Sequence, residues 1–273
     1  MPGESVSVLI ITFNEETTLE MCLNSVKWSN DIVIVDSFST DKTELITNNF
    51  KNVRFYQRKF DNFSSQRNYG LHDIAFKNDW VFLIDADEIC SEQLGKEILN
   101  EAAKENSNVT SFVVSRKDYF YGKVMRCHFP VCLERVVRPK EVAFTGIVHE
   151  SLESCENQKA LKNHILHYPF AKGIHYWFER HNNYSTLMAN MLSNNTYTLQ
   201  LSDLMSRNPR KRQKAMKYIF MYLPARPIIY FLFKYIIKCG FLDGWKGLIF
   251  VLMETYYHFM VVIKDETIKW NHK

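Results

Sequence analysis

The chain has 273 residues, 46% of them apolar and 14% aromatic, with only 9 Gly, 7 Pro and a formal net charge of +4. This composition excludes a disordered chain, a collagen-like repeat and a disulfide-stabilised miniprotein, and the length is sufficient for a large core. The six cysteines form no CxxC pair and no zinc-finger spacing, so we expect reduced thiols and a cytoplasmic protein.

The first apolar run is short and rich in β-branched residues. Ser5 to Phe13 (SVSVLIITF) therefore predicts a strand, and the acidic start before it argues against a signal peptide. The polar residues Asn14 and Glu15 follow, and apolar residues at helical spacing run from Leu19 to Val26. We expect a strand followed by a helix.

The same order of strand and helix then repeats. Short apolar runs at Ile32–Asp36, Val53–Tyr56 and Trp80–Asp85 predict three further strands, with helical spacing between them. Strands that alternate with helices of this length form a mostly parallel sheet with helices on both faces. We therefore predict an α/β fold.

Polar clusters follow three of these strands. They are Thr12-Phe13-Asn14-Glu15, Asp36-Ser37-Phe38-Ser39-Thr40-Asp41 and Asp85-Ala86-Asp87-Glu88. Ligands of such sheets bind outside the carboxyl ends of the strands, so we expect the clusters to line one site. A single acid at a strand end is often only the start of the next helix, and we interpret Glu88 in this way.

Asp85 and Asp87 form a DxD pair at the end of the most apolar strand. Alternate side chains of an extended segment share a face, so both carboxylates are predicted to point to the same side. Such oxygen ligands suit Mg²⁺ or Mn²⁺, which can also bind substrate phosphates. The absence of GxGxxG after the first strand and of GxxxxGK[ST] in the chain excludes a dinucleotide site and a P-loop.

The pattern changes after about residue 107. Strands with long polar connections are expected near 111–116 and 134–137, and from Gly173 onward the chain is helical and aromatic. We therefore predict a sheet domain at 1–170 and a helical, basic region at 171–273.

The C-terminal region is strongly basic in one part. Leu204 to Leu242 holds nine Lys or Arg and no acid, which fits a solvated helix face, an anionic membrane surface or nucleic acid. The apolar segment Gly247–Ile263 has only 17 residues and includes Glu254 and His258. A buried or interfacial helix therefore fits better than a membrane span.

Four motifs carry a resemblance to a known family: VSVLIITFNEE, DIVIVDSFSTDKT, SSQRNYGL and WVFLIDADE. In this order they resemble family 2 glycosyltransferases, which have the GT-A fold. The later segments TGIVHESLE, HYPF and FLFKYIIKCGFLDGWKGLIFVLMETYYHF resemble the subgroup that adds glucose or heptose to the lipopolysaccharide inner core. The resemblance implies an inverting enzyme that needs a divalent metal, Mg or Mn, and a nucleotide-sugar donor, for which we expect UDP-glucose.

The resemblance also implies a donor site in the first two clusters. Thr12 and Glu15 would lie beside the base and ribose, and Asn14 would shape the turn. Asp36 would accept a hydrogen bond from uracil, and Ser39 belongs to the same predicted site.

The diphosphate and the metal would lie at the third cluster. Arg67 would meet the diphosphate, because a guanidinium fork suits phosphate oxygens. Asp85 would touch the ribose or the metal, and Asp87 would ligate the metal directly.

Inversion in a single displacement needs a general base that takes the acceptor proton. We favour Glu150, with His149 either orienting it, approaching the metal, or serving only as a structural histidine. Glu134 is the rival base, and His167 is a weaker metal candidate. The chain departs from its relatives at Pro130-Val131 and Ser37-Phe38, which affects the expected acceptor region and the base-binding turn.

The predicted function is transfer of a hexose to a lipopolysaccharide-core or other cell-surface glycan, at the inner face of the membrane. The partners would be the donor, a glycan or glycolipid acceptor and anionic lipid, without nucleic acid and with no expectation for oligomeric state. One alternative is a nucleotidyltransferase, which the acidic turn Phe13–Glu16 disfavours because it would repel a triphosphate. The other is a non-catalytic basic module that binds membrane or nucleic acid.

Overall fold

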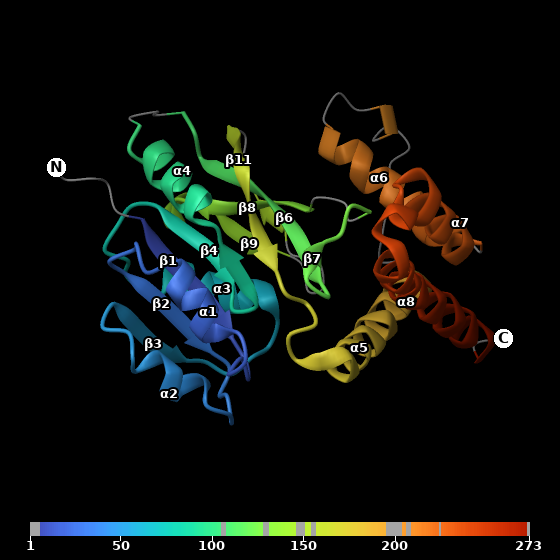
Figure 1. Cartoon of the computed structure of the whole chain (residues 1–273), viewed down its shortest axis with the longest axis horizontal. Helices are drawn as coiled ribbons and strands as arrows, with labels where there is room; N and C mark the ends of the chain where they lie inside the picture. The colour runs from blue at the N-terminus through green and yellow to red at the C-terminus, as the bar shows by residue number, and fades with distance from the viewer. Residues whose placement is uncertain are drawn as a thin grey trace. The chain divides into compact units, whose positions relative to one another are not determined.

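The computed structural model describes residues 6–104, 108–127, 131–145, 151–153, 157–194, 204–205, 209–223 and 225–271. It divides into two compact units (Figure 1). The first unit comprises 1–119 and 129–171, and the second comprises 120–128 and 172–273. Residues 120–128, which the sequence pattern assigns to the first part, therefore group with the helical C-terminal region.

A mixed β-sheet organises the first unit. Its strands lie in the order β3-β2-β1-β4-β8-β6-β11-β5. They are β1 (Ser7–Thr12), β2 (Ile32–Asp36), β3 (Val53–Gln57), β4 (Val81–Asp85), β5 (Glu88–Cys90), β6 (Ser111–Phe120), β8 (Val131–Val137) and β11 (Gln158–His167). A separate antiparallel pair is formed by β9 (Ala143–Thr145) and β10 (Ser151–Glu153).

The four strands expected from the N-terminal pattern are all parallel neighbours. Beyond β4 the direction alternates, because β8 runs antiparallel to both β4 and β6 while β11 runs parallel to β6. The predicted α/β fold with the GT-A arrangement is confirmed, and the sheet is parallel in its first half and mixed in its second.

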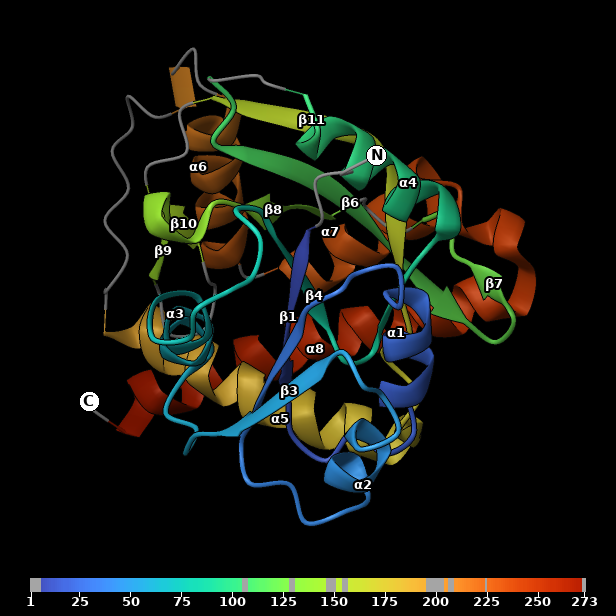
Figure 2. The same cartoon turned by 90° about the vertical axis from the view of Figure 1, so that its left-hand side faces the viewer.

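Helices cover both faces of this sheet (Figure 2). On one face α1 (Leu19–Ser25) and α4 (Glu92–Ala102) share a core with alternate residues of the central strands, and α2 (Thr43–Thr47) lies beside α1. On the other face α3 (Phe63–His72) packs on the intervening residues. The strands are buried on both sides, which explains why they read as continuous apolar runs.

One glycine allows α3 to approach the sheet. A Cβ added at Gly70 would lie 2.6 Å from Leu9 Cδ1 on β1. A larger residue would push the helix outward. The close approach places Arg67, one turn earlier in α3, over the end of β4.

The second unit is helical in the residues described. Its elements are α5 (Gly173–Ser193), α6 (Pro209–Tyr222), α7 (Arg226–Leu232), η3 (Phe233–Ile237), η4 (Gly240–Asp243) and α8 (Gly244–Asn271), with the short β7 (Lys123–Val124). The apolar helix predicted at Gly247–Ile263 is therefore longer than expected. By length and composition Gly240–Asn271 could cross a membrane, a test that core helices of soluble proteins also pass, and 28% of its most apolar window is buried.

Charged residues of this apolar helix have partners within the unit. Glu254 Oε2 lies 3.1 Å from Lys234 Nζ on η3, and the Lys234 side chain is buried. Lys264 Nζ donates to the Asn182 carbonyl on α5 at 2.7 Å. These contacts tie one face of α8 to its neighbours.

Candidate active site

The ends of β1 and β2 are joined by a hydrogen-bonded turn. Thr12 Oγ1 donates to Asp36 Oδ1 at 2.9 Å, and the Ser39 backbone N–H donates to Asp36 Oδ2 at 2.8 Å. Asp36 is fully buried, so its carboxylate is held by these partners. Thr12, Asp36 and Ser39, all predicted for the donor site, are brought together here.

Asn14 continues this turn in a strained conformation. Its φ is 53°, a value that non-glycine residues other than Asn and Asp rarely adopt. Its N–H donates to Ser39 Oγ at 2.8 Å, and its Oδ1 accepts from the Thr40 N–H at 2.8 Å. Asn14 therefore joins the end of β1 to the segment that follows β2.

Glu15 lies at the start of the segment that leads into α1. Its side chain accepts from Thr18 Oγ1 at 2.8 Å, and its backbone N–H donates to Thr43 Oγ1 at 2.8 Å. The residue therefore connects the first strand end to both following helices.

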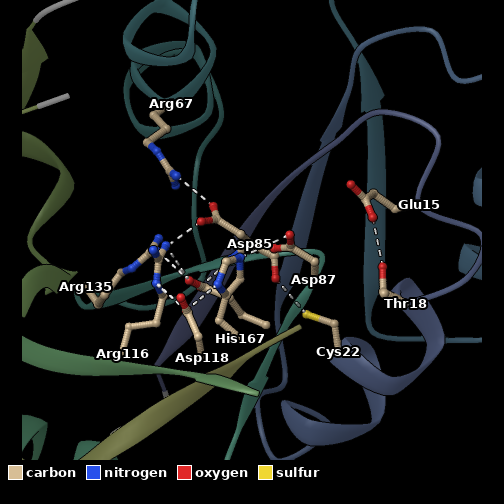
Figure 3. A network of polar contacts seen from close by, with 11 residues as sticks. Glu15, Thr18, Cys22, Arg67, Asp85, Asp87, Arg116, Asp118, Arg135 and His167 are labelled. Atoms are coloured by element: carbon tan, nitrogen blue, oxygen red, sulfur yellow. Dashed lines mark hydrogen bonds and ion pairs between the residues drawn. The ribbon is translucent and has the colours of Figure 1, made fainter. Parts of the chain in front are cut away.

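Asp85, at the end of β4, binds two arginines from different elements (Figure 3). Its Oδ1 accepts from Arg67 Nη2 at 2.7 Å, and its Oδ2 accepts from Arg135 Nη2 at 2.9 Å. Burial raises the pKa of Asp85, but the attraction of Arg135 and Arg67 outweighs it and holds the pKa well below the usual range. The group is therefore an anion that orients two guanidinium groups.

Glu88 is a buried part of the same network, and not simply the start of a helix. Its Oε1 accepts from Arg135 Nη2 at 2.8 Å, and its Oε2 accepts from the Asp85 N–H at 2.9 Å. Burial raises its pKa more than the charge of Arg135 lowers it, and Asp85 raises it further. Helix α4 instead begins at the N-cap Ser91, so the interpretation of Glu88 as a helix start was wrong.

A β-bulge in β8 directs the Arg135 side chain toward Asp85 and Glu88. Phe112 of β6 pairs with Val136, and the next residue, Val113, pairs with Glu134. Arg135 therefore has no residue opposite it in the ladder, the arrangement by which a β-bulge redirects a side chain. Its side chain is buried.

Asp87 lies close to His167, which comes from strand β11 near the other edge of the sheet. His167 Nε2 on β11 lies 3.3 Å from Asp87 Oδ2, and its Nδ1 lies 2.7 Å from Asp118 Oδ1 on β6. Burial lowers the pKa of His167, but the attraction of Asp87 and the hydrogen bonds to both acids raise it to about 9. The Tyr168 N–H donates to the Asp87 carbonyl at 2.9 Å and fixes the loop.

This pair fits two ligand positions of a divalent metal ion. A carboxylate and a neutral imidazole are suitable donors, and a histidine that ligates a metal commonly gives its other nitrogen to a carboxylate, as His167 does to Asp118. Because the pKa of His167 is raised to about 9, a metal ion would have to displace the proton on Nε2. Among the described residues no three His, Cys, Asp or Glu side chains gather as a complete metal site. Asp85 would have to release an arginine before it could ligate a metal.

The predicted general base and its partner lie outside the described residues, since Glu150 and His149 fall in 146–150. The rival base, Glu134, accepts from Gln158 Nε2 at 3.1 Å. This contact joins Glu134 to the start of β11.

Sequence reasoning missed several functional residues. Glu88, Arg116 and Asp118 were not among the candidates, although Arg116 Nη1 lies 3.7 Å from Glu88 Oε1. The available signal was charge within the strand 111–120, where Arg116, Lys117 and Asp118 follow one another. Such residues in a buried strand need partners.

Comparisons with known proteins agree with this geometry. The model of "Glycosyl transferase family 2" matches residues 7–189. The lipopolysaccharide core biosynthesis glycosyltransferase LpsC of Rhizobium meliloti (strain 1021) is 31% identical over 126 residues, 45% of this chain and 46% of that protein. The SPbeta prophage-derived glycosyltransferase SunS of Bacillus subtilis (strain 168) is 30% identical over 202 residues, 72% of this chain and 44% of that protein.

The chain spans about half the length of these curated relatives. Among solved structures, S. aureus TarS 1-349 matches with a TM-score of 0.45 and 13% identity, over 98% of this chain and 92% of that one. The family model covers the turn that holds Asp36, the DxD pair and His167 in one continuous match, so the chain belongs to glycosyl transferase family 2.

Proposed function

We propose that this protein is a metal-dependent inverting glycosyltransferase that moves a hexose from a nucleotide sugar, with UDP-glucose the expected donor. The acceptor would be a lipopolysaccharide-core or other cell-surface glycan. The observation that carries the proposal is the convergence of the Asp36 turn, the Asp85 arginine pair and the Asp87–His167 pair at the carboxyl ends of neighbouring strands. Family membership favours glycosyl over nucleotidyl transfer.

The nucleoside would lie against the first turn. Thr12, Asp36 and Ser39 hold each other in place, so the turn is organised before the donor arrives. Preorganised groups lower the entropy cost of binding. Asp36 is proposed as the acceptor for uracil, and Glu15 as a neighbour of the ribose.

The diphosphate would bind to Arg67 and Arg135, the two arginines that are paired with Asp85. Arg67 and Arg135 present guanidinium groups whose planar forks suit phosphate oxygens. Asp85 forms an ion pair with each of them, and its single negative charge leaves positive charge for the phosphates. We propose that donor phosphates share these groups with Asp85, which keeps the arginines oriented.

Asp87 and His167 would hold the metal, with Asp118 fixing the imidazole. When bound, a divalent ion supplies positive charge that offsets the charge developing on the departing nucleoside diphosphate. Asp85 stays a proposed neighbour of the ribose or metal, and His149 a further proposed ligand.

The acceptor hydroxyl must lose a proton as it attacks the anomeric carbon. Glu150 is proposed as the base, and Glu134 as its rival. We also propose that residues 1–170 bind the donor and that 171–273 contact the acceptor or a membrane surface.

The test is release of UDP from UDP-glucose in the presence of Mn²⁺ or Mg²⁺. Asp87→Asn should reduce the rate by roughly 100-fold or more, because a carboxylate ligand is lost. The matched control is Asp79→Asn, an exposed acid just before β4. Release that persists in Asp87→Asn, or that needs no divalent ion, would refute the metal role, and a screen of other nucleotide sugars would identify the donor.

A further inference from the structure

Helix α8 carries a second apolar face that its own unit leaves uncovered. One face is buried, with Phe250, Val251 and Val261 packed inward. The opposite face exposes a row of aliphatic and aromatic side chains, here called the α8 stripe: Trp245, Ile249, Leu252, Tyr256, Phe259 and Ile263. Trp245 is 60% exposed, Leu252 48% and Phe259 49%.

The stripe is a continuous line along the helix. Its members are separated by alternating steps of four and three residues, which keeps them on one side of an α-helix. Neighbours within the second unit widen it, because the Phe178 ring on α5 lies 5.6 Å from Tyr256 and the Tyr121 ring lies 5.8 Å from Trp245. Monomeric soluble proteins rarely expose so long an apolar surface.

The charge of the second unit indicates what could cover the stripe. The chain has 34 Lys and Arg and 30 Asp and Glu. The second unit holds 17 basic and 6 acidic residues, and the first unit holds 17 basic and 24 acidic residues. The small net charge of the whole chain is therefore the sum of a basic second unit and an acidic first unit. A basic unit is attracted to a negatively charged surface.

The acids on and around the stripe have basic partners. Glu266, one turn after Ile263, is exposed and lies 3.5 Å from Lys269 Nζ. Asp243, just before α8, is buried and lies 3.0 Å from Lys123 Nζ. Glu254 lies on the other side of the helix, paired with Lys234. Each of these acids has a lysine partner, which reduces its repulsion of an anionic surface that approaches the stripe.

We propose that the α8 stripe docks on the surface of an anionic bilayer, with α8 parallel to the membrane plane and its apolar side chains inserted at the headgroup boundary. This is the geometry of interfacial amphipathic helices, in which apolar contact and attraction to anionic lipid act together. Trp245 at the start of the stripe suits the interface, where indole rings concentrate. Docking would hold the enzyme beside a membrane-bound acceptor and does not depend on the donor.

Two other arrangements fit less well. A second copy packed on the stripe as a coiled coil would use charged pairs at the flanking positions to select its partner. One flank is Leu248, Thr255 and Val262, and the other is Lys246, Met253 and Met260, which offer one basic residue and no acid to pair with it. A membrane span would need lipid around the whole helix, whereas Lys264 and Glu254 tie its other face to α5 and η3.

Flotation of the full chain with lipid vesicles tests the proposal. We expect binding to vesicles of phosphatidylcholine with phosphatidylglycerol, little binding to phosphatidylcholine alone, and release by high salt. The double variant Leu252→Glu, Phe259→Glu should lower binding by roughly tenfold or more, because two apolar contacts become charges. Both positions are exposed, and circular dichroism and UDP release report the fold and the active site separately from docking.

The matched control is Met21→Glu with Leu45→Glu, which makes the same charge change at exposed apolar residues of the first unit. This control should bind vesicles as the parent does. The proposal is overturned if the parent does not float, if the stripe variant binds equally, or if binding ignores lipid charge. It is also overturned if the stripe variant only turns a dimer into a monomer, which would assign the stripe to a second copy, or if alkaline carbonate fails to extract the bound protein, which would indicate a span.

Discussion

The Nδ1 atom of His167 donates to Asp118 Oδ1 at 2.7 Å, and both side chains are buried. The two residues come from neighbouring strands, β11 and β6, whose register places them directly opposite each other. Because Nδ1 is held, Nε2 is directed at Asp87, 3.3 Å away. Asp118 therefore fixes the orientation of the His167 ring.

Asp118→Ala should weaken metal affinity by about 10- to 100-fold, because a carboxylate that orients a ligating histidine has effects of this size. Titration with Mn²⁺, followed by UDP release at each concentration, measures it. Saturating metal should restore much of the rate, whereas a purely structural defect would not respond to metal. Asp79→Asn should leave the Mn²⁺ dependence unchanged.

Arg67→Lys should raise the KM for the nucleotide sugar by roughly 10-fold or more, since a lysine keeps the charge but loses the planar fork. Steady-state kinetics with the donor varied would show it. Arg54→Lys is the control, because Arg54 binds Asp31, at the amino-terminal end of β2, and should not affect the donor. An unchanged KM in Arg67→Lys would place the diphosphate elsewhere.

Arg135→Ala should lower the free energy of unfolding by about 3–5 kcal/mol, because it leaves the buried Glu88 without its nearest cation and removes one of the two arginines that bind Asp85. Adding Glu88→Gln should recover part of the loss, since one of the two charges is removed. Urea denaturation of the single and double variants measures the coupling. The exposed Arg126→Ala should change stability by less than about 0.5 kcal/mol.

The free energy of unfolding of the second unit should decrease as the pH is lowered, because of the titration of His181. Its ring stacks on Trp177, and its Nδ1 lies 2.8 Å from the Trp177 carbonyl. Burial lowers its pKa from 6.5 to about 4, with Arg180 adding to this and the Trp177 carbonyl opposing it. A depressed histidine pKa favours the neutral form in the folded state, so the unfolded chain binds the proton first as the pH drops below 6.5.

Between pH 6.5 and 5 the loss should be roughly 1–2 kcal/mol. Chemical denaturation at the two pH values measures it, and His181→Phe should flatten the dependence while keeping a ring against Trp177. The exposed His175→Phe should retain it. Equal acid sensitivity in His181→Phe and the parent would exclude this histidine as the cause.

Much of the first unit could be predicted from the local pattern of apolar residues. The β-branched runs at Ser7–Thr12, Ile32–Asp36 and Val81–Asp85 are strands, because a strand buried on both faces has no room for polar residues. Their order also placed Asp36 and Asp85 at one sheet edge, since parallel strands end on the same side.

The lengths and borders of helices were less readable. Helix α8 extends to Gly244–Asn271, beyond the apolar segment 247–263, because helices continue through polar residues that face solvent or pair with neighbours. Lys269, for example, lies 2.8 Å from Asp265 one turn earlier.

The sequence by itself determined the alternation of strands and helices in the parallel half, the position of the DxD pair and the basic character of the C-terminal region. Only the tertiary structure decided which charges meet there. Arg135 reaches Asp85 through a bulge, and His167 reaches Asp87 across strands more than 70 residues apart in the chain. These partnerships depend on register between distant strands, which hydrophobic periodicity does not encode, because it reports only which face of each strand is buried.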